Sequence, residues 1–315
     1  MKNIVVAGCG VLGSQIAYQT AFKGFNVTAW LRSDASIERA KPKLENLKKT
    51  YLEILEGLKQ YCGSGNAVYP QGMTDGLSAL TPQDLDGLKE QAVRAYENIA
   101  LTTDMAAAVK DADLVIESVA EDPEAKKDVY KKLAPLLPAK TIITTNSSTM
   151  LPSAFAEYTG RPEKYLALHF ANKIWTNNTG EIMGHSGTSE QAYNAVVEFA
   201  AQIGMIPLCL KKEQPGYILN SLLIPFVSAG QALYANGIAD PETIDLCWRK
   251  GTGNPAGPFQ ILDIVGLVTA YNIVIMNPDA ADQSTTPGKI AANLKERIDA
   301  GKTGVAAGEG FYKYK

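Results

Sequence analysis

Two histidines are the residues best suited to chemistry in this 315-residue chain, because near neutral pH an imidazole can both take and give a proton. His169 lies near the end of a short apolar run, residues 165–170, and polar Asn172 follows that run. His185 lies in Gly-His-Ser-Gly, a sequence typical of a surface loop. We therefore expect His169 to be a catalytic acid–base, and we assign no role to His185.

A catalytic histidine needs an acceptor that fixes its tautomer and stabilises the imidazolium, and a carboxylate usually serves. Glu181, twelve residues after His169, is the candidate if the segment between them folds back as a loop; the alternative is a surface glutamate. Ser148 lies just after the apolar run 141–145. Its hydroxyl could hold a substrate oxygen, cap a helix that begins after Asn146, or do both.

A glycine-rich turn near the N-terminus predicts a dinucleotide site. An apolar run, residues 4–7, leads into Gly8-Cys9-Gly10-Val11-Leu12-Gly13, and a helix-like stretch and a second apolar run follow. Gly8 allows a tight turn, Gly10 lets a pyrophosphate approach the backbone, and Gly13 lets the helix pack on its strand. The free N–H groups at the start of the helix would face the phosphates. The alternative is a tight turn in another kind of α/β protein.

The end of the second apolar run indicates which dinucleotide is bound. NAD sites usually carry Asp or Glu there for the ribose 2′-hydroxyl, but this chain has Leu31, Arg32 and Ser33. A guanidinium and a hydroxyl suit a 2′-phosphate, and we expect Asp34 to point into the next loop. The sequence therefore favours NADP(H), with NAD(H) as the other candidate. Arg32 could instead be solvated or stack on the adenine without selecting a cofactor.

Composition excludes several other classes of protein. The net charge is −3, from 30 basic and 33 acidic residues, so no electrostatic footprint for nucleic acid or for an anionic membrane is present. The four cysteines are scattered without metal-ligand spacing, which favours free thiols in a reducing compartment and no metal. We expect no segment long enough to span a bilayer, and hence a cytoplasmic protein.

Three further apolar runs, residues 113–117, 141–145 and 165–170, read as buried parallel strands joined by helical crossovers. Polar residues follow each of them. Ligands bind at the carboxyl ends of such strands, so these side chains should gather around one crevice with the glycine turn. The residues concerned are Glu121, Asn146, Ser148, His169 and Asn172.

The chain changes character after about residue 203, where mainly helical segments follow. The segment 218–234 is apolar nearly all round, as a buried or dimer-packed helix would be. We expect an α/β dinucleotide-binding domain over residues 1–202 and a helical domain over residues 203–315. An amphipathic stretch, residues 35–61, carries lysines that could meet an anionic substrate tail or simply be solvated: Lys41, Lys43, Lys48 and Lys49.

These motifs resemble the 3-hydroxyacyl-CoA dehydrogenase family over nearly the whole chain. The motifs are GCGVLG, DLVIESVAED, TNSS, LHFAN, QPGYILNSLLIPF and GTGNPAGPFQILDIVG, and stretches such as GVLGSQIA and ADPETID are similar to the diketoreductase branch. The resemblance implies a Rossmann-type doubly wound parallel sheet followed by an all-α dimerisation domain, and hence a homodimer. It implies that His169 and Glu181 act with Ser148 and Asn220 at the substrate oxygen. It also places Glu121, Lys126 and Asn172 near the nicotinamide.

One segment departs from the family pattern. The usual HFFNPVP-type stretch is replaced by residues that include Trp175, Asn177 and Asn178, so a β-keto or β,δ-diketo compound without CoA becomes a candidate substrate beside the acyl-CoA. The sequence thus predicts a reversible oxidoreductase for a 3-hydroxy/3-oxo acyl compound. One alternative of another class stays open, a dinucleotide-binding sensor without turnover. A β-hydroxyacid dehydrogenase would use lysine as the acid–base, and the histidine at the strand end discriminates against it.

Overall fold

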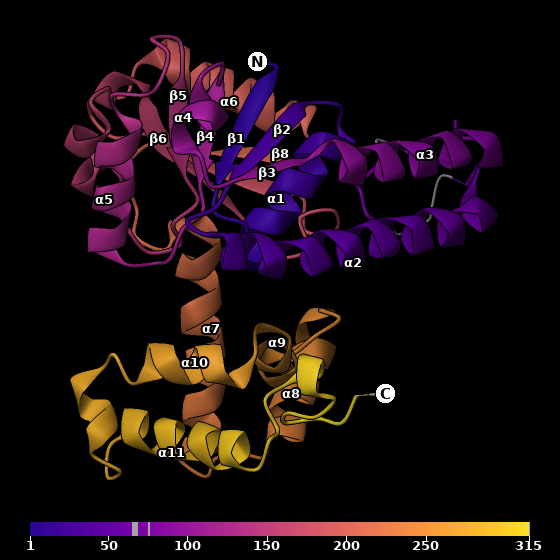
Figure 1. Ribbon diagram of the computed structural model, residues 1–315. Coiled ribbons are helices and arrows are strands. Elements are labelled where there is room, and N and C mark those ends of the chain that lie inside the picture. Colours follow the sequence, from indigo (N-terminus) through magenta and orange to yellow (C-terminus); the bar gives the residue numbers. More distant parts are fainter. Residues whose placement is uncertain (65–68, 75, 315) are drawn as a thin grey trace. The chain divides into compact units, whose positions relative to one another are not determined.

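The computed structural model describes residues 1–64, 69–74 and 76–314 (Figure 1). The chain forms two compact units, Met1–Ile218 and Leu219–Lys315. The expected domain boundary at residue 203 is therefore too early. Strand β8, Ile206–Cys209, pairs with β7, Thr179–Met183, and so belongs to the sheet of the first unit.

The first unit is built on an eight-stranded sheet with the order β3-β2-β1-β4-β5-β6-β7-β8. The remaining strands are β1 Asn3–Ala7, β2 Asn26–Trp30, β3 Ala100–Thr102, β4 Leu114–Glu117, β5 Ile142–Thr145 and β6 Tyr165–Phe170. Neighbouring strands are parallel except for β6 and β7, which are antiparallel. The doubly wound sheet predicted from the sequence is confirmed, with this one reversal.

Helices cover both faces of the sheet, as the alternation along β1 requires. Ile4 and Val6 pack into one hydrophobic cluster with the first three helices and α6, whereas Val5 and Ala7 pack into another with α4 and α5. The helices of this unit are α1 Val11–Phe22, α2 Asp34–Leu58, α3 Pro82–Asn98, α4 Met105–Val109, α5 Pro123–Leu133 and α6 Glu190–Gln202.

One sequence expectation fails between β5 and β7. The β5–β6 connection is not a helical crossover but three short 3₁₀ turns, Pro152–Ala154, Ala156–Thr159 and Pro162–Lys164. The segment between His169 and Glu181 does fold back, as expected, and Glu181 lies on strand β7, antiparallel to β6. The sequence of β7, Thr-Gly-Glu-Ile-Met, places a glycine and a charged residue inside a short strand, which weakens the local strand signal.

The second unit is helical. Its elements are α7 Tyr217–Ala235, which begins in the first unit, α8 Pro241–Thr252, α9 Pro258–Val265, α10 Leu267–Val274 and α11 Thr286–Asp299. Its core gathers around Phe259, Leu262 and Leu294. Helix α7 has 19 residues and a mean hydropathy of 1.4, so by length and composition it could cross a membrane. This differs from the expectation of no such segment, although a core or interface helix passes the same test.

Candidate active site

The glycine turn has the geometry that a pyrophosphate needs. Gly8 has φ +104°, and a Cβ there would lie 2.4 Å from the carbonyl oxygen of Ser118. A Cβ on Gly13 would lie 2.2 Å from the carbonyl oxygen of Gly8, whereas a Cβ on Gly10 would meet nothing within 4 Å. The turn therefore closes tightly on the neighbouring strand and stays open toward the start of α1. This cradle fits a dinucleotide phosphate at the N-terminus of that helix.

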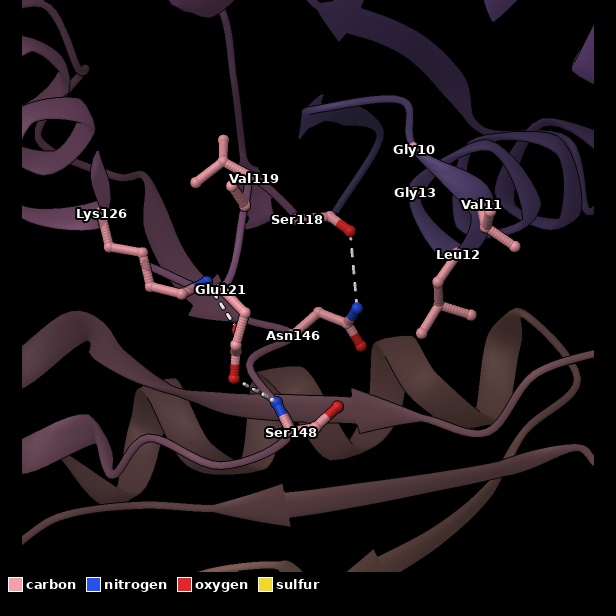
Figure 2. A pocket seen from close by; sticks show the side chains of 11 residues that line it. Gly10, Val11, Leu12, Gly13, Ser118, Val119, Glu121, Lys126, Asn146 and Ser148 are labelled. Carbon is pink, nitrogen blue, oxygen red and sulfur yellow. Dashed lines mark hydrogen bonds and ion pairs between the residues drawn. The ribbon is translucent and has the colours of Figure 1, made fainter. Parts of the chain in front are cut away.

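A cavity of about 340 Å³ lies beside this turn (Figure 2). It gathers residues from the glycine turn, from the segment after β4 and from the segment after β5. Its lining is Gly10, Val11, Leu12, Gly13, Ser118, Val119, Ala120, Glu121, Lys126, Asn146 and Ser148. The prediction that Glu121, Asn146 and Ser148 meet the glycine turn at one edge of the sheet is confirmed.

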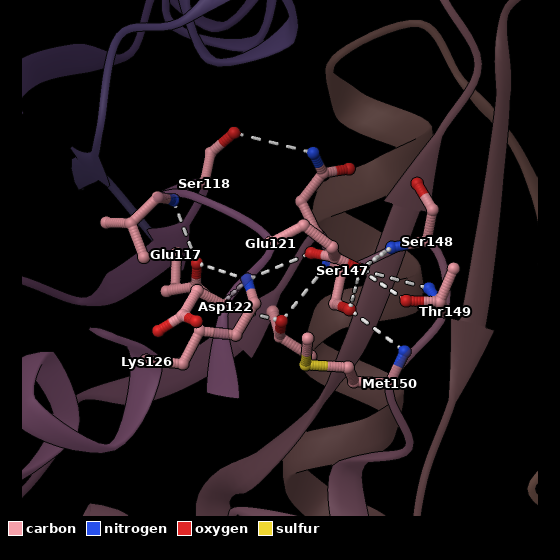
Figure 3. Close-up of polar contacts among 12 residues, drawn as sticks. Glu117, Ser118, Glu121, Asp122, Lys126, Ser147, Ser148, Thr149 and Met150 are labelled. Atoms are coloured by element: carbon pink, nitrogen blue, oxygen red, sulfur yellow. Dashed lines mark hydrogen bonds and ion pairs between the residues drawn. The ribbon is translucent and has the colours of Figure 1, made fainter. Parts of the chain in front are cut away.

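Glu121 organises the turn that carries Ser148 (Figure 3). One carboxylate oxygen accepts hydrogen bonds from the Ser147 hydroxyl at 2.5 Å, the Ser148 N–H at 3.1 Å and the Thr149 hydroxyl at 2.8 Å. Lys126 Nζ lies 3.3 Å from the other oxygen. Burial alone would raise the pKa of Glu121, but these hydrogen bonds and the Lys126 charge outweigh it and lower the pKa. Glu121 therefore stays ionised and holds the turn in place.

Glu117 is a residue of this network to which sequence reasoning gave no role. Its carboxylate is fully buried at the end of β4 and binds Lys126 Nζ at 2.8 and 3.0 Å. It also accepts hydrogen bonds from Tyr130 at 2.7 Å and Thr145 at 2.8 Å. A buried ammonium needs such a partner, so Glu117 fixes Lys126 at the wall of the cavity. An acid that ends an apolar strand, nine residues before a lysine, was the available signal.

His169 lies between a carboxylate and a hydroxyl. Its Nδ1 is 2.9 Å from Glu181 Oε2 and its Nε2 is 3.1 Å from Ser148 Oγ. The imidazole and Glu181 are both buried. Since a carboxylate only accepts, Nδ1 carries the proton and Nε2 faces Ser148. Ser148 lines the cavity, whereas His169 and Glu181 are not in its lining. This arrangement can pass a proton through Nε2 while Glu181 balances the charge of the imidazolium.

The turn after β5 does not start a helix, so Ser148 has no capping role. Ser147 closes this turn instead, because its hydroxyl accepts a hydrogen bond from the Met150 N–H at 3.0 Å. Asn146 is tied to the neighbouring strand, since its Oδ1 accepts from the Phe170 N–H at 3.2 Å. The Ser148 hydroxyl therefore remains directed at His169.

A second cavity, of about 550 Å³, lies at the end of β2. It shares Gly10, Ser118, Val119 and Ala120 with the first cavity and includes Leu31 and Arg32, as expected. Ser33 is not in its lining: its hydroxyl caps α2 by accepting from the Ser36 N–H at 3.3 Å. Asp34 is the first residue of α2 rather than part of a loop.

Helix α2 supplies two of the four cationic side chains described in the lining of this second cavity, Arg39 and Lys43. Ser36, Arg39 and Lys43 line it together with Arg32, and Arg39 donates to the Ser36 hydroxyl at 2.9 Å. Sequence reasoning did not place Ser36 or Arg39 here, although the spacing of Ser36, Arg39 and Lys43 puts all three on one helical face. Among the lining residues that the structure describes, Asp128 carries the single carboxylate, and it pairs with Lys132 at 2.6 Å.

Other predicted residues lie outside the two linings. Asn172 is exposed after β6, and its Oδ1 accepts from Gln15 of α1 at 3.3 Å. Trp175 is buried in the core, with its ring centroid 5.6 Å from that of Tyr51. Asn220 lies in the second unit.

The chain matches known proteins along its whole length. The model of the 3-hydroxyacyl-CoA dehydrogenase NAD binding domain matches residues 3–60 and 71–214, and the model of the C-terminal domain of the same family matches residues 216–314. A probable 3-hydroxyacyl-CoA dehydrogenase of Caenorhabditis elegans is 30% identical over 100% of this chain and 93% of the relative. Human mitochondrial hydroxyacyl-coenzyme A dehydrogenase is 29% identical over 100% of this chain and 92% of its own length.

A solved diketoreductase, described by its substrate-directed dual catalysis of dicarbonyl compounds, is 48% identical, with a TM-score of 0.85 and coverage of 100% of this chain and 99% of the other. Since two family models together cover almost every residue, the chain belongs to the 3-hydroxyacyl-CoA dehydrogenase family and is an oxidoreductase of the kind that acts on CH–OH groups.

Proposed function

We propose that the chain interconverts a 3-hydroxy and a 3-oxo compound with NADP(H), using His169 as the acid–base. The observation that carries this proposal is the buried chain of contacts from Glu181 through His169 to Ser148, at the wall of the cavity beside the glycine turn. The nicotinamide, when bound, gives or takes the hydride. The side chains of the protein hold the substrate oxygen and transfer the proton.

In the reducing direction, the Ser148 hydroxyl and the His169 Nε2–H hold the keto oxygen of the substrate. The imidazolium gives its Nε2 proton to that oxygen as hydride arrives at the carbon. Glu181 keeps Nδ1 protonated and balances the charge before the transfer. In the oxidising direction the neutral imidazole takes the proton back. We assign Asn220 to the same substrate oxygen, and Glu121, Lys126 and Asn172 to the nicotinamide end of the cofactor.

The cavity at the end of β2 supports NADP(H) over NAD(H). A 2′-phosphate there would meet Arg32, Arg39 and Lys43, and guanidinium groups bind phosphate in bidentate fashion. Leu31 occupies the place where an NAD site usually has an acid. We infer that Ser36 adds a hydroxyl to the same phosphate.

The substrate is best sought among dicarbonyl compounds. The diketoreductase that acts on them is 48% identical to this chain, whereas the human relative that is named for hydroxyacyl-coenzyme A is 29% identical. A 3-oxoacyl-CoA is the second candidate, because the family is named for it. We also propose a homodimer, since large apolar side chains of the second unit are exposed, among them Leu222, Ile238, Ile264 and Met276.

The test is a titration of the purified protein with NADPH and with NADH, in which nicotinamide oxidation is followed with acetoacetyl-CoA and with a β,δ-diketo ester. We expect the highest kcat/KM with NADPH and the diketo ester. A preference for NADH would show that the residues at the end of β2 do not select the 2′-phosphate. The acid–base assignment would still stand. Cofactor binding without turnover across a wide panel of carbonyl compounds would favour a sensor instead.

A further inference from the structure

Tyr217 contacts His169 and the backbone of Ser147, and the residue after it, Ile218, contacts Glu181. Its ring stacks on the His169 imidazole, with the ring centroids 4.5 Å apart and the planes 15° from parallel. Its hydroxyl donates to the carbonyl oxygen of Ser147 at 2.8 Å, one residue before Ser148. The N–H of the next residue, Ile218, donates to Glu181 Oε1 at 2.8 Å, while the other oxygen of Glu181 holds His169.

The backbone at Tyr217 is held in an unfavourable conformation to make these contacts. Tyr217 has φ +53°, a region that bulky side chains rarely adopt. Glycine would fit this conformation at lower cost, and Gly216 directly precedes it. The side chain is nevertheless an aromatic ring that is only 1% exposed. Such strain persists where many surrounding contacts hold the residue in place, and it is frequent at active sites.

The phenol itself does not transfer protons. Burial, together with the charges of Glu121, Glu181, Glu117 and Glu213, holds the pKa of Tyr217 well above its ordinary value. The hydroxyl therefore stays protonated and remains a donor to Ser147. What the ring offers His169 is a flat face, stacked on the imidazole, that restricts its rotation.

We propose that Tyr217 is a positioning residue that fixes the plane of the His169 imidazole and anchors the Ser148 turn. This inference rests on the proposed function of His169. Charged groups near these contacts include Glu181 on β7, whose carboxylate holds His169, and Glu121, which holds the Ser148 turn and pairs with Lys126. Glu117 and Glu213 also act on Tyr217.

The experiment compares Tyr217→Leu, which removes the ring, with Tyr217→Phe, which removes only the hydroxyl. For Tyr217→Leu we expect kcat to fall about tenfold with KM changed less than about threefold, because orientation is lost and substrate contacts are kept. Tyr217→Phe keeps the ring and should lose only about threefold in kcat.

The controls separate this inference from the function on which it rests. Tyr61→Leu replaces an exposed tyrosine of the same unit and should match wild type. Full turnover by His169→Ala would overturn the proposed function itself. If His169→Ala is inactive while Tyr217→Leu keeps the kcat of wild type, only the role of Tyr217 is overturned.

A measurement on the wild-type protein covers the case in which Tyr217→Leu does not fold. The chain has two histidines, His169 and His185, so their ring protons can be assigned by NMR with a His185→Gln variant. Ring current from Tyr217 should shift the His169 ring protons upfield of their usual positions, and Tyr217→Phe should preserve the shift. Unshifted His169 protons would overturn the stacking and the inference with it.

Discussion

His169 and Glu181 lie directly opposite each other across the antiparallel pair of β6 and β7. Side chains at opposite positions of neighbouring strands point to the same face of a sheet, so the register alone brings the imidazole to the carboxylate. Two buried strands restrict the movement of both groups, and Nδ1 lies 2.9 Å from the carboxylate oxygen. The proposed acid–base pair is therefore a property of the sheet rather than of a loop.

The first prediction concerns that pair. His169→Ala should lower kcat by about a hundredfold or more if proton transfer carries its usual share. Glu181→Gln should also lower kcat, by about tenfold or more, because an amide cannot balance the imidazolium charge. Stopped-flow or steady-state assays of nicotinamide oxidation measure both, and unchanged binding of NADPH is the control. Near-normal turnover in His169→Ala would refute the mechanism.

The second prediction concerns cofactor choice at the end of β2. Arg39→Ala should raise the KM for NADPH about tenfold and leave the KM for NADH within about twofold, since a charged hydrogen bond to the 2′-phosphate is lost. Leu31→Asp should favour NADH, because a carboxylate there binds the 2′-hydroxyl and repels the phosphate. Arg94→Ala, an exposed arginine on α3 that pairs with Glu90, is the matched control. Equal losses for both cofactors in Arg39→Ala would mean that Arg39 does not read the phosphate.

Local sequence patterns predicted most of the strands and turns that position this site. The glycine turn and the runs that became β4, β5 and β6 show in the sequence, because apolar strands and glycine spacing are local properties. The fold-back that brings Glu181 to His169 was predicted, but the register that places them opposite each other was not, since register between β6 and β7 is set by tertiary packing. Ser33 stays a predicted cofactor ligand, although its hydroxyl caps α2 and it is not in the lining of the second cavity. That capping depends on where α2 begins.

Glu117 and Tyr217 show what sequence patterns leave out. An acid that ends an apolar strand, nine residues before a lysine, is a weak sequence signal, and the role of Glu117 becomes clear when Lys126, Tyr130 and Thr145 converge on it in three dimensions. The positive φ of Tyr217 has no periodic signature at all. Such residues violate local preferences, and violations of this kind are expected at functional sites.

The third prediction concerns Cys9 in the glycine turn. Burial raises the pKa of the Cys9 thiol to about 11, and the nearby Lys43 charge opposes this only in part. At pH 8 about one thiol in a thousand is then ionised, and only the thiolate reacts. Iodoacetamide labelling followed by peptide mass spectrometry should modify exposed Cys209 and Cys247 well before Cys9. Denatured protein should label at all four cysteines, and early labelling of Cys9 in the native protein would contradict the burial.

The fourth prediction concerns the stability of the helical unit. The buried Asp263 carboxylate accepts hydrogen bonds from the N–H groups of Phe311 and Tyr312 at 2.8 and 2.9 Å and from the Tyr314 hydroxyl at 2.8 Å. Asp263→Ala leaves these donors without an acceptor and should cost about 3 kcal/mol of unfolding free energy. Chemical denaturation followed by circular dichroism measures the loss. The control is Asp299→Ala, which removes an exposed carboxylate of α11 paired with Lys295. It should cost less than about 1 kcal/mol of unfolding free energy. Equal losses for the two variants would show that Asp263 does not hold the C-terminal segment.

The fifth prediction concerns the exposed apolar residues of the second unit. Leu222 on α7 is 69% exposed. Covering this leucine and its apolar neighbours on the helix would lower the free energy of the protein in water. If a second copy covers them, the protein should sediment at about twice the 33.8 kDa of one chain. Leu222→Arg should then shift it toward the mass of a single chain, because a desolvated charge opposes the interface. Leu136→Arg, at an exposed leucine of the first unit, should leave the mass unchanged.

The alternative partner of α7 is a bilayer, because this helix is long and apolar enough to cross a membrane. A wild-type protein that sediments as a single chain and floats with lipid vesicles would favour that alternative.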